Sequence, residues 1–242
     1  MIVNYTESGW EIITQRAHGL LAAQICAHWE DKPLPERWVE TLIATAEHDD
    51  VYNEFENDDL LNEKGGPVNF SATEFRKDYC ETLIKMAETK SVYIALLVSQ
   101  HIQFVHGEDP KGSSFCKQLR DQEKEWFKIS GLDRKEVGRA YDLLQFCDAF
   151  SLLICQRLVQ PENRKIEISK GPDGVAYEMC SNGSQQLTIS PWPFDCPEFT
   201  VSFEHRTLDV LSFKNIEQFR NAVAKAKVKV ECITFKRSED SA

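Results

Sequence analysis

Apolar residues recur at helical spacing along the first two thirds of the chain. Leu21, Ile25 and Trp29 share one stripe, and the segment from Val92 to Val98 is apolar on nearly every side. The pattern predicts six helices, at about residues 15–29, 36–48, 71–89, 91–105, 114–129 and 133–158. The helix at 91–105 is expected to be central and buried, because it has no polar face.

Two of these predicted helices begin at a capping box, in which a short polar side chain is followed three residues later by a glutamate. Ser71 with Glu74 predicts one helix start, and Asp133 with Glu136 predicts the other. In each case the first side chain would accept a hydrogen bond from a free backbone amide.

Short alternating segments and turn residues flank this helical region. Residues 2–5 and 10–14 predict a small hairpin, and strands at 165–169 and 175–179 around Pro172-Asp173-Gly174 predict another. Further strands are predicted at 186–190, 199–205 and 228–235, and one short helix at 215–226. The predicted fold is α+β, with a helical bundle over residues 1–160 that includes the hairpin at 2–14. A smaller, antiparallel β-rich region with one short helix would follow over residues 161–242.

The charge is uneven between the two parts. The net charge is −11, and residues 161–242 hold 11 bases and 12 acids, so that nearly all of the excess lies in the first 160 residues. Eight acids and no base lie between Glu47 and Glu63, where we expect a solvated loop. This acidity argues against nucleic acid as a partner and favours a small-molecule substrate.

Targeting and membrane segments are not evident in the sequence. The first residues do not read as a signal peptide, and the purest apolar run, Val92 to Val98, is too short to span a bilayer. The eight cysteines include no Cys-x-x-Cys pair, so we expect reduced thiols. These features predict a cytoplasmic protein with no membrane partner; the oligomeric state stays open.

A contiguous His48-Asp49 pair at the end of an apolar helical stretch is the first candidate for chemistry. Burial of an imidazole and a carboxylate without partners costs several kcal/mol, and a divalent metal would satisfy both. His18, His101 and Asp148 lie on other predicted helices and are candidates for the same centre. Imidazole and carboxylate ligands together suit iron, manganese or zinc.

The ordered set of a first His, a His-Asp pair and a distant Asp resembles the HD superfamily of metal-dependent phosphohydrolases. The segments around His18-Gly19, Glu47-His48-Asp49, Ala95–His101 and Phe146–Leu152 are similar to an uncharacterised bacterial HD-like family, known as domain of unknown function 3891. Pro191-Trp192-Pro193-Phe194 is similar as well. The resemblance implies an HD-like bundle, with His18, His48, Asp49 and Asp148 as metal ligands and His101 as a further ligand or phosphate contact.

The number of ions is expected to be one rather than two. A second ion would usually need one more His, and His106 lies five residues after His101, which is about 140° further round a helix. The resemblance implies a hydrolase that acts on a small phosphoester, with Asp49 and Asp50 as catalytic groups. Arg16 and Lys64 would supply positive charge for substrate binding. The remaining histidines (28, 106 and 205) are expected to be ordinary packing or surface residues.

Two other functions remain open from the sequence. HD-like sites also host di-iron oxygenases, which would use His101 as an added ligand. Alternatively, the site would hold a metal or small ligand without turnover. Each candidate ligand also has an ordinary structural interpretation, since a lone buried His or Asp is often simply paired; Asp148, for example, would pair with Arg139 or Ser151.

Overall fold

The computed structural model of the chain describes residues 1–30, 34–56, 60–181, 183 and 185–238. Part of the predicted acidic loop, residues 57–59, lies outside this set. The described residues form helices α1 (Gln15–Ala27), α2 (Trp38–Glu47), α3 (Lys77–Glu88), α4 (Val92–His106), α5 (Ser113–Ser130), α6 (Arg134–Cys155) and α7 (Ile216–Lys225), and a short 3-10 turn, η1 (Phe70–Ala72). The strands are β1 (Ile2–Thr6), β2 (Gly9–Ile13), β3 (Ile166–Lys170), β4 (Ala176–Ser181), β5 (Gln186–Ser190), β6 (Glu198–Leu208) and β7 (Val228–Lys236).

One curled sheet contains all of these strands, in the order β1-β2-β6-β7-β5-β4-β3. Neighbouring strands are antiparallel except β5 and β7, which pair in parallel at Gln186–Thr234 and Leu187–Phe235. Strand β2 of the N-terminal hairpin pairs with β6 through Trp10–Leu208 to Ile12–Arg206. The N-terminal hairpin is therefore an edge of the same sheet that the C-terminal strands form.

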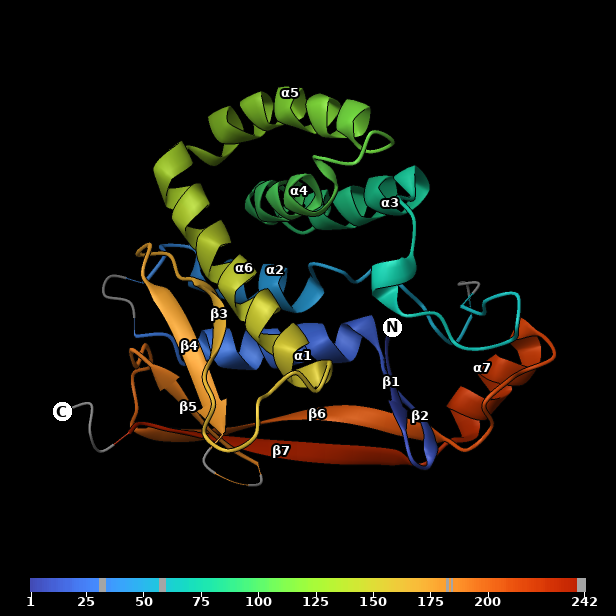
Figure 1. Cartoon of the computed structure of the whole chain (residues 1–242). Helices are drawn as coiled ribbons and strands as arrows, with labels where there is room; N and C mark the ends of the chain where they lie inside the picture. The colour runs from blue at the N-terminus through green and yellow to red at the C-terminus, as the bar shows by residue number, and fades with distance from the viewer. Residues whose placement is uncertain (31–33, 57–59, 182, 184, 239–242) are drawn as a thin grey trace.

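The helices lie in two layers above this sheet. Figure 1 shows α1 and α6 next to the sheet with α2 above α1, and α3, α4 and α5 further away. One apolar core joins α1 and α6 to the sheet and includes Leu21, Phe150 and Phe235. A second core surrounds α4, whose residues Ile94 to Val98 are at most 2% exposed. The prediction of a buried central helix at 91–105 is confirmed, because its apolar faces meet α2, α3, α5 and α6.

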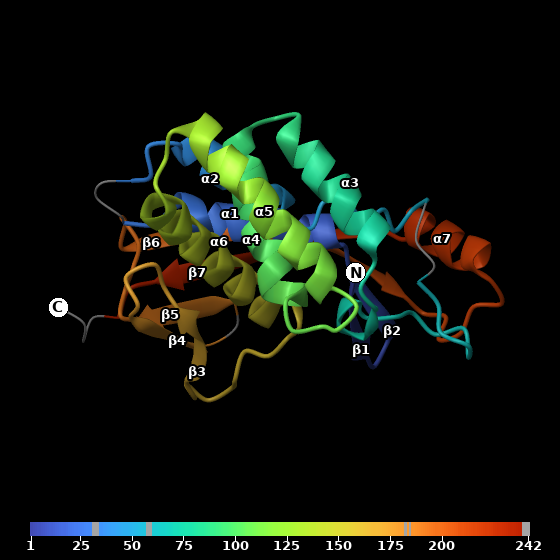
Figure 2. The same ribbon diagram turned by 90° about the horizontal axis from the view of Figure 1, so that it is seen from above.

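Helix α7 lies at the far end of the sheet, away from the other helices. Figure 2 shows it beside the β1–β2 hairpin. Phe219 and Val223 of α7 are fully buried. They belong to a third apolar core with Met1, Ile12, Leu60, Leu208 and Phe213. This third core fixes the hairpin edge of the sheet.

The predicted architecture, an N-terminal helical bundle followed by a smaller β-rich region, is wrong. The fold is mixed α/β, and its sheet takes strands from both ends of the chain. Alternation along β1 and β2 indicated a hairpin, but pairing between strands about 195 residues apart left no local pattern. The parallel pair β5–β7 was hidden for the same reason. The predicted boundary between residues 160 and 161 stays a prediction, and the sheet contains strands from both sides of it.

The two capping boxes had different outcomes. Asp133 and Glu136 form a complete capping box at the start of α6, as predicted. Ser71 instead lies within η1, which Asn69 caps, and α3 begins only at Lys77. The predicted helix start at Ser71 is therefore wrong. None of the described helices has both the length and the apolar character that crossing a membrane requires.

Candidate metal centre

Five side chains, of which Asp49 is 28% exposed and the other four are buried, meet beneath the outer helical layer. His18 lies on α1, His48 caps the C-terminus of α2 and Asp49 follows it, while His101 and Asp148 lie on α4 and α6. The three histidines are at most 3% exposed and Asp148 is 7% exposed. The structure thus brings together all five residues that the sequence singled out as ligand candidates.

A glycine next to His18 allows α1 and α2 to approach closely enough for this meeting. A Cβ atom at Gly19 would lie 2.4 Å from the carbonyl oxygen of Ala46, which is well inside van der Waals contact. The backbones of the two helices therefore touch just before α2 ends. This contact brings His18 beside the His48-Asp49 pair.

The Asp49 carboxylate lies among the three histidines. Its Oδ2 is 3.5 Å from His18 Nε2 and 3.8 Å from His48 Nε2, and its Oδ1 is 3.8 Å from His101 Nε2. Gln15, one turn before His18, donates from Nε2 to Asp49 Oδ2 at 2.9 Å and holds the carboxylate. The sequence interpretation missed Gln15, although its spacing from His18 places both on one face of α1.

The tautomer of His48 follows from its backbone contact. Its Nδ1 lies 2.8 Å from the Thr45 carbonyl oxygen, which can only accept, so Nδ1 carries a proton. The Nε2 atom lies 3.1 Å from Oδ1 of Asp148 and also faces Asp49. In a neutral ring this nitrogen presents a lone pair to two carboxylates, so a second proton or a cation is needed between them.

His18 is oriented in the same way by a side chain on α6. Ser151 Oγ donates to the carbonyl oxygen of Asp148 at 2.9 Å, so it accepts from His18 Nδ1, which lies 3.1 Å away. Its Nε2 therefore carries the lone pair in a neutral ring. Among the residues that the structure describes, this atom has no hydrogen-bond partner, and it faces Asp49.

The charges of the cluster and its burial shift the pKa of four of its groups. Burial by itself lowers the pKa of His48, but the charges of Asp148 and Asp49 outweigh this effect and raise the pKa to about 9. Burial and the charge of His48 lower the pKa of His101 to about 4, so His101 is neutral at pH 7. Although burial opposes it, the charge of His48 holds the pKa of both Asp49 and Asp148 below the usual range. The protonated ring of His48 thus faces the two ionised carboxylates of Asp49 and Asp148.

The spacing of the donor atoms fits coordination of one ion. Two ligands that each lie about 2.1 Å from one metal are about 3.0 to 3.4 Å apart at octahedral or tetrahedral angles. The distances from His48 Nε2 to Asp148 Oδ1, 3.1 Å, and from His18 Nε2 to Asp49 Oδ2, 3.5 Å, are close to this range. Within the trios His18–His48–Asp49 and His48–His101–Asp148, the possible ligand atoms all lie within 4.8 Å of one another. Neutral imidazoles with oriented lone pairs and ionised carboxylates are the donor set that iron, manganese or zinc requires.

A narrow cavity leads from this cluster towards the surface between α3 and α4. It offers about 40 Å³ to water-sized molecules and is lined by His48, Asp49 and His101 at its inner end. Arg76 and Tyr79 also line it, with the guanidinium of Arg76 4.1 Å from the centroid of the Tyr79 ring. The sequence interpretation missed Arg76, because no motif ties residues just before α3 to a centre built by the other helices.

The remaining predicted site residues lie elsewhere. Asp50 forms an ion pair with Arg16, whose Nε is 2.5 Å from Asp50 Oδ1, and neither residue lines the cavity at His101. Lys64 lies in a loop where its carbonyl oxygen accepts from Ser212, also outside that cavity lining.

His106, which was expected to be an ordinary packing or surface residue, lines the cavity and contacts the Phe75 ring edge-on.

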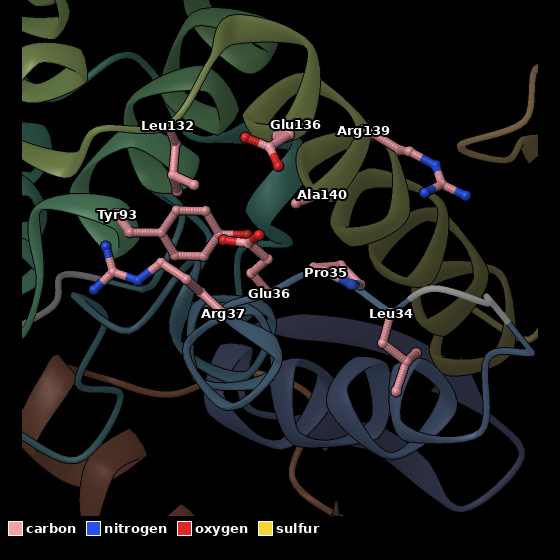
Figure 3. A pocket seen from close by; sticks show the side chains of 9 residues that line it. All are labelled: Leu34, Pro35, Glu36, Arg37, Tyr93, Leu132, Glu136, Arg139 and Ala140. Atoms are coloured by element: carbon pink, nitrogen blue, oxygen red, sulfur yellow. The ribbon is translucent and has the colours of Figure 1, made fainter.

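A larger hollow of about 230 Å³ opens at the other end of the same helices (Figure 3). The Glu36 and Glu136 carboxylates point towards it over the Tyr93 ring, whereas the side chain of Arg139 extends away. Tyr93 precedes His101 by eight residues on α4, which is about 12 Å along the helix. This hollow therefore shares no lining residue with the His–Asp cluster.

Fold and site define a mixed α/β protein with a buried His–Asp cluster at the meeting point of four helices. The profile of a family described as "Protein of unknown function (DUF3891)" matches residues 1–210. The chain belongs to this family, and the matched region contains every residue of the cluster. Neither the curated proteins nor the solved structures contain a match to the chain.

Proposed function

We propose that the cluster binds one divalent metal ion, with His18, His48, Asp49 and Asp148 as ligands, and that the protein is a metal-dependent hydrolase of small phosphoesters. The observation that carries the proposal is the orientation of two imidazoles. The backbone of Thr45 and the hydroxyl of Ser151 accept from Nδ1 of His48 and His18, which turns Nε2 of both rings towards carboxylates. Lone pairs directed at anions in a buried site call for a cation.

One ion fits these ligands better than two. His48 belongs to both trios of donor atoms, but its Nδ1 is taken by Thr45, so only Nε2 is left for a metal. The order of ligands along the chain, a His, a His-Asp pair and a distant Asp, resembles that of the HD superfamily. This resemblance concerns the ligand set and not the architecture.

A divalent ion at this position would lower the pKa of a bound water and polarise a phosphoryl oxygen. The chain's own groups would do the rest. Gln15 and Ser151 keep Asp49 and His18 oriented. His101 lies at the inner end of the cavity, neutral at pH 7, and would accept a proton from the attacking water. Arg76 would contact the phosphate at the outer part of the same cavity.

Metal content and activity test this proposal together. The His–Asp cluster of the purified full chain should retain about one equivalent of manganese, iron or zinc, and the protein should hydrolyse simple phosphomonoesters or phosphodiesters. Asp148→Asn keeps the shape of the side chain but removes its charge, so metal and activity should both be lost. Asp50→Asn is the matched control for metal content, because Asp50 pairs with Arg16 outside the cluster. Equal metal content in both variants would overturn the assignment of Asp148 as a ligand. A metal-loaded protein that hydrolyses none of the phosphoesters would overturn the proposed hydrolase activity.

A di-iron oxygenase is the second candidate, favoured by the arrangement of Asp49. Its two oxygens face different histidines, with Oδ2 towards His18 and Oδ1 towards His101. A bridging carboxylate would use both oxygens in this way. Two irons per chain, with an iron charge-transfer band in the visible spectrum, would favour this function over the hydrolase.

A further inference from the structure

A second group of metal-ligating side chains lies where the C-terminus of α1 meets the loop between β5 and β6. His28 caps α1, and Asp195 and Cys196 lie in that loop. The Nδ1 atom of His28 is 3.7 Å from the Sγ of Cys196 and 3.6 Å from Oδ1 of Asp195. We propose that these three residues bind a divalent transition metal of the zinc class, independently of the His–Asp cluster.

The backbone holds the two halves of this group in place. Trp29 and Phe194 form an isolated antiparallel bridge, and Asp195 N donates to the carbonyl oxygen of His28 at 2.9 Å. Trp29 and Phe194 are 7% and 2% exposed and belong to the core between α1, α6 and the sheet. The loop that carries Asp195 and Cys196 is therefore anchored beside His28 by buried contacts on both sides.

Side-chain contacts fix the donor groups further. The His28 ring stacks on Phe199 with centroids 4.0 Å apart, and Trp192 Nε1 donates to the carbonyl oxygen of Cys196 at 3.0 Å. The His28 and Asp195 side chains remain 36% and 53% exposed. The ligands are thus held by the protein on one side and open to solvent on the other, which leaves room for a water as a fourth ligand.

The distances fit a tetrahedral zinc-like ion, and the one between His28 and Asp195 is too long for a direct hydrogen bond. With bonds of about 2.3 Å to sulfur and about 2.1 Å to nitrogen and oxygen, tetrahedral angles place the nitrogen about 3.6 Å from the sulfur and about 3.4 Å from the oxygen. The observed separations of 3.7 and 3.6 Å are close to these values. A hydrogen bond from Nδ1 to a carboxylate is normally about 2.7 to 3.0 Å long.

The same geometry argues against a nucleophilic cysteine. In a Cys–His–Asp relay, the thiol and the carboxylate contact different nitrogens of the imidazole. Here both face Nδ1 of His28, so the carboxylate cannot orient a ring that serves the thiol. A sulfur, an oxygen and a nitrogen that all lie within 4.8 Å of one another instead form a donor set that a metal can bind.

Sulfur coordination separates this site experimentally from the His–Asp cluster, which contains no thiol ligand. The full chain, stripped with a chelator, is titrated with Co²⁺ while the near-ultraviolet thiolate-to-cobalt charge-transfer band is recorded. In Asp148→Asn, where the His–Asp cluster should not take up cobalt, we expect the band to saturate at about one equivalent per chain. The band should disappear in Cys196→Ser. His28→Gln and Asp195→Asn should weaken Co²⁺ binding about tenfold or more.

Two variants serve as controls. Cys232 is exposed on β7, and Cys232→Ser should keep the full band. Asp148→Asn should also keep it, whether or not the His–Asp cluster binds metal. The absence of any band, or a band that persists in Cys196→Ser, would overturn the proposal, and so would a band that His28→Gln leaves unchanged.

Discussion

The Nε2 atom of His48 lies 3.1 Å from Oδ1 of Asp148, although 100 residues separate them in the chain. His48 ends α2, and Asp148 lies in the middle of α6. Because the other nitrogen of His48 is bound to the Thr45 carbonyl, this contact needs an additional proton or a metal ion. Loss of that proton or ion leaves an uncompensated buried carboxylate, so the contact controls stability as well as binding.

The metal-free protein should lose stability in mildly alkaline solution. The pKa of His48 is raised from 6.5 to about 9. The protonated imidazole therefore stabilises the fold fully below pH 6.5, and this stabilisation is lost as the pH rises through about 9, by up to about 3 kcal/mol. Urea unfolding of chelator-treated protein at several pH values should show this fall. The fall should be absent in His48→Gln and smaller in metal-loaded protein; an unchanged free energy of unfolding across the range would contradict the prediction.

Gly19→Ala should destabilise the protein, because the added Cβ meets the Ala46 carbonyl oxygen at 2.4 Å. Separation of α1 from α2 should cost about 1 to 3 kcal/mol and also weaken metal binding at His18. Gly138→Ala is the matched control, since nothing lies within 4 Å of the new Cβ in α6. This control should stabilise the protein by about 0.5 to 1 kcal/mol, as alanine favours helix. Denaturant unfolding measures both free energies. A Gly19→Ala variant as stable as Gly138→Ala would contradict the close contact between α1 and α2.

Arg76→Gln should raise the KM for a phosphoester roughly three- to tenfold and leave kcat nearly unchanged. The reason is that Arg76 lines the cavity at the cluster but does not touch the proposed ligands. Steady-state kinetics should show no effect for Arg164→Gln, whose side chain is 62% exposed beside Glu162. Arg16→Gln tests the sequence-based prediction that Arg16 binds the substrate. A raised KM in this variant, but not in Arg76→Gln, would show that Arg16 and not Arg76 contacts the phosphate.

Arg157→Ala should strongly destabilise the part of the sheet formed by β2, β6 and β7. Arg157 Nη2 lies 2.8 Å from Glu11 of β2 and 2.6 Å from Glu231 of β7. Its removal takes the guanidinium from Glu11, which is 7% exposed and keeps contacts with Asn4 and His205, and should cost about 3 to 5 kcal/mol. Arg164→Ala, at an exposed pair, should cost less than about 1 kcal/mol. Thermal unfolding measures the loss of stability in both variants. Similar losses would show that the ion pairs of Arg157 with Glu11 and Glu231 contribute little.

The periodicity of the sequence determined most of the local structure. The stripe that contains Leu21 and Ile25 became α1, and the apolar run from Val92 became the buried α4. The capping box at Asp133 marked the start of α6, because capping depends on residues within one turn. Ser71 met the same rule without forming a helix, since Asn69 supplied a competing cap to a shorter turn.

The candidate cluster was accessible from the sequence in part. His48 and Asp49 stood out because they end an apolar helix. The other ligands were proposed because a His, a His-Asp pair and a distant Asp follow one another along the chain in the same order as in the HD superfamily. The spacing of Gln15 and His18 put both on one face of α1, but it did not show that Gln15 would hold Asp49. No local pattern indicated that Arg76 would line the cavity. Such contacts join different helices, and their spacing in the chain has no fixed period.

The sequence by itself thus determined which segments form helices and strands, because those choices depend on neighbouring residues within a turn or a pleat. Only the tertiary structure decided that β2 pairs with β6 and that β5 lies parallel to β7. It also decided that Asp148 meets His48, and that His28 meets Cys196 across 168 positions. Burial of apolar surface between distant segments selects these pairings, and that driving force is nondirectional and leaves no signature in any one segment.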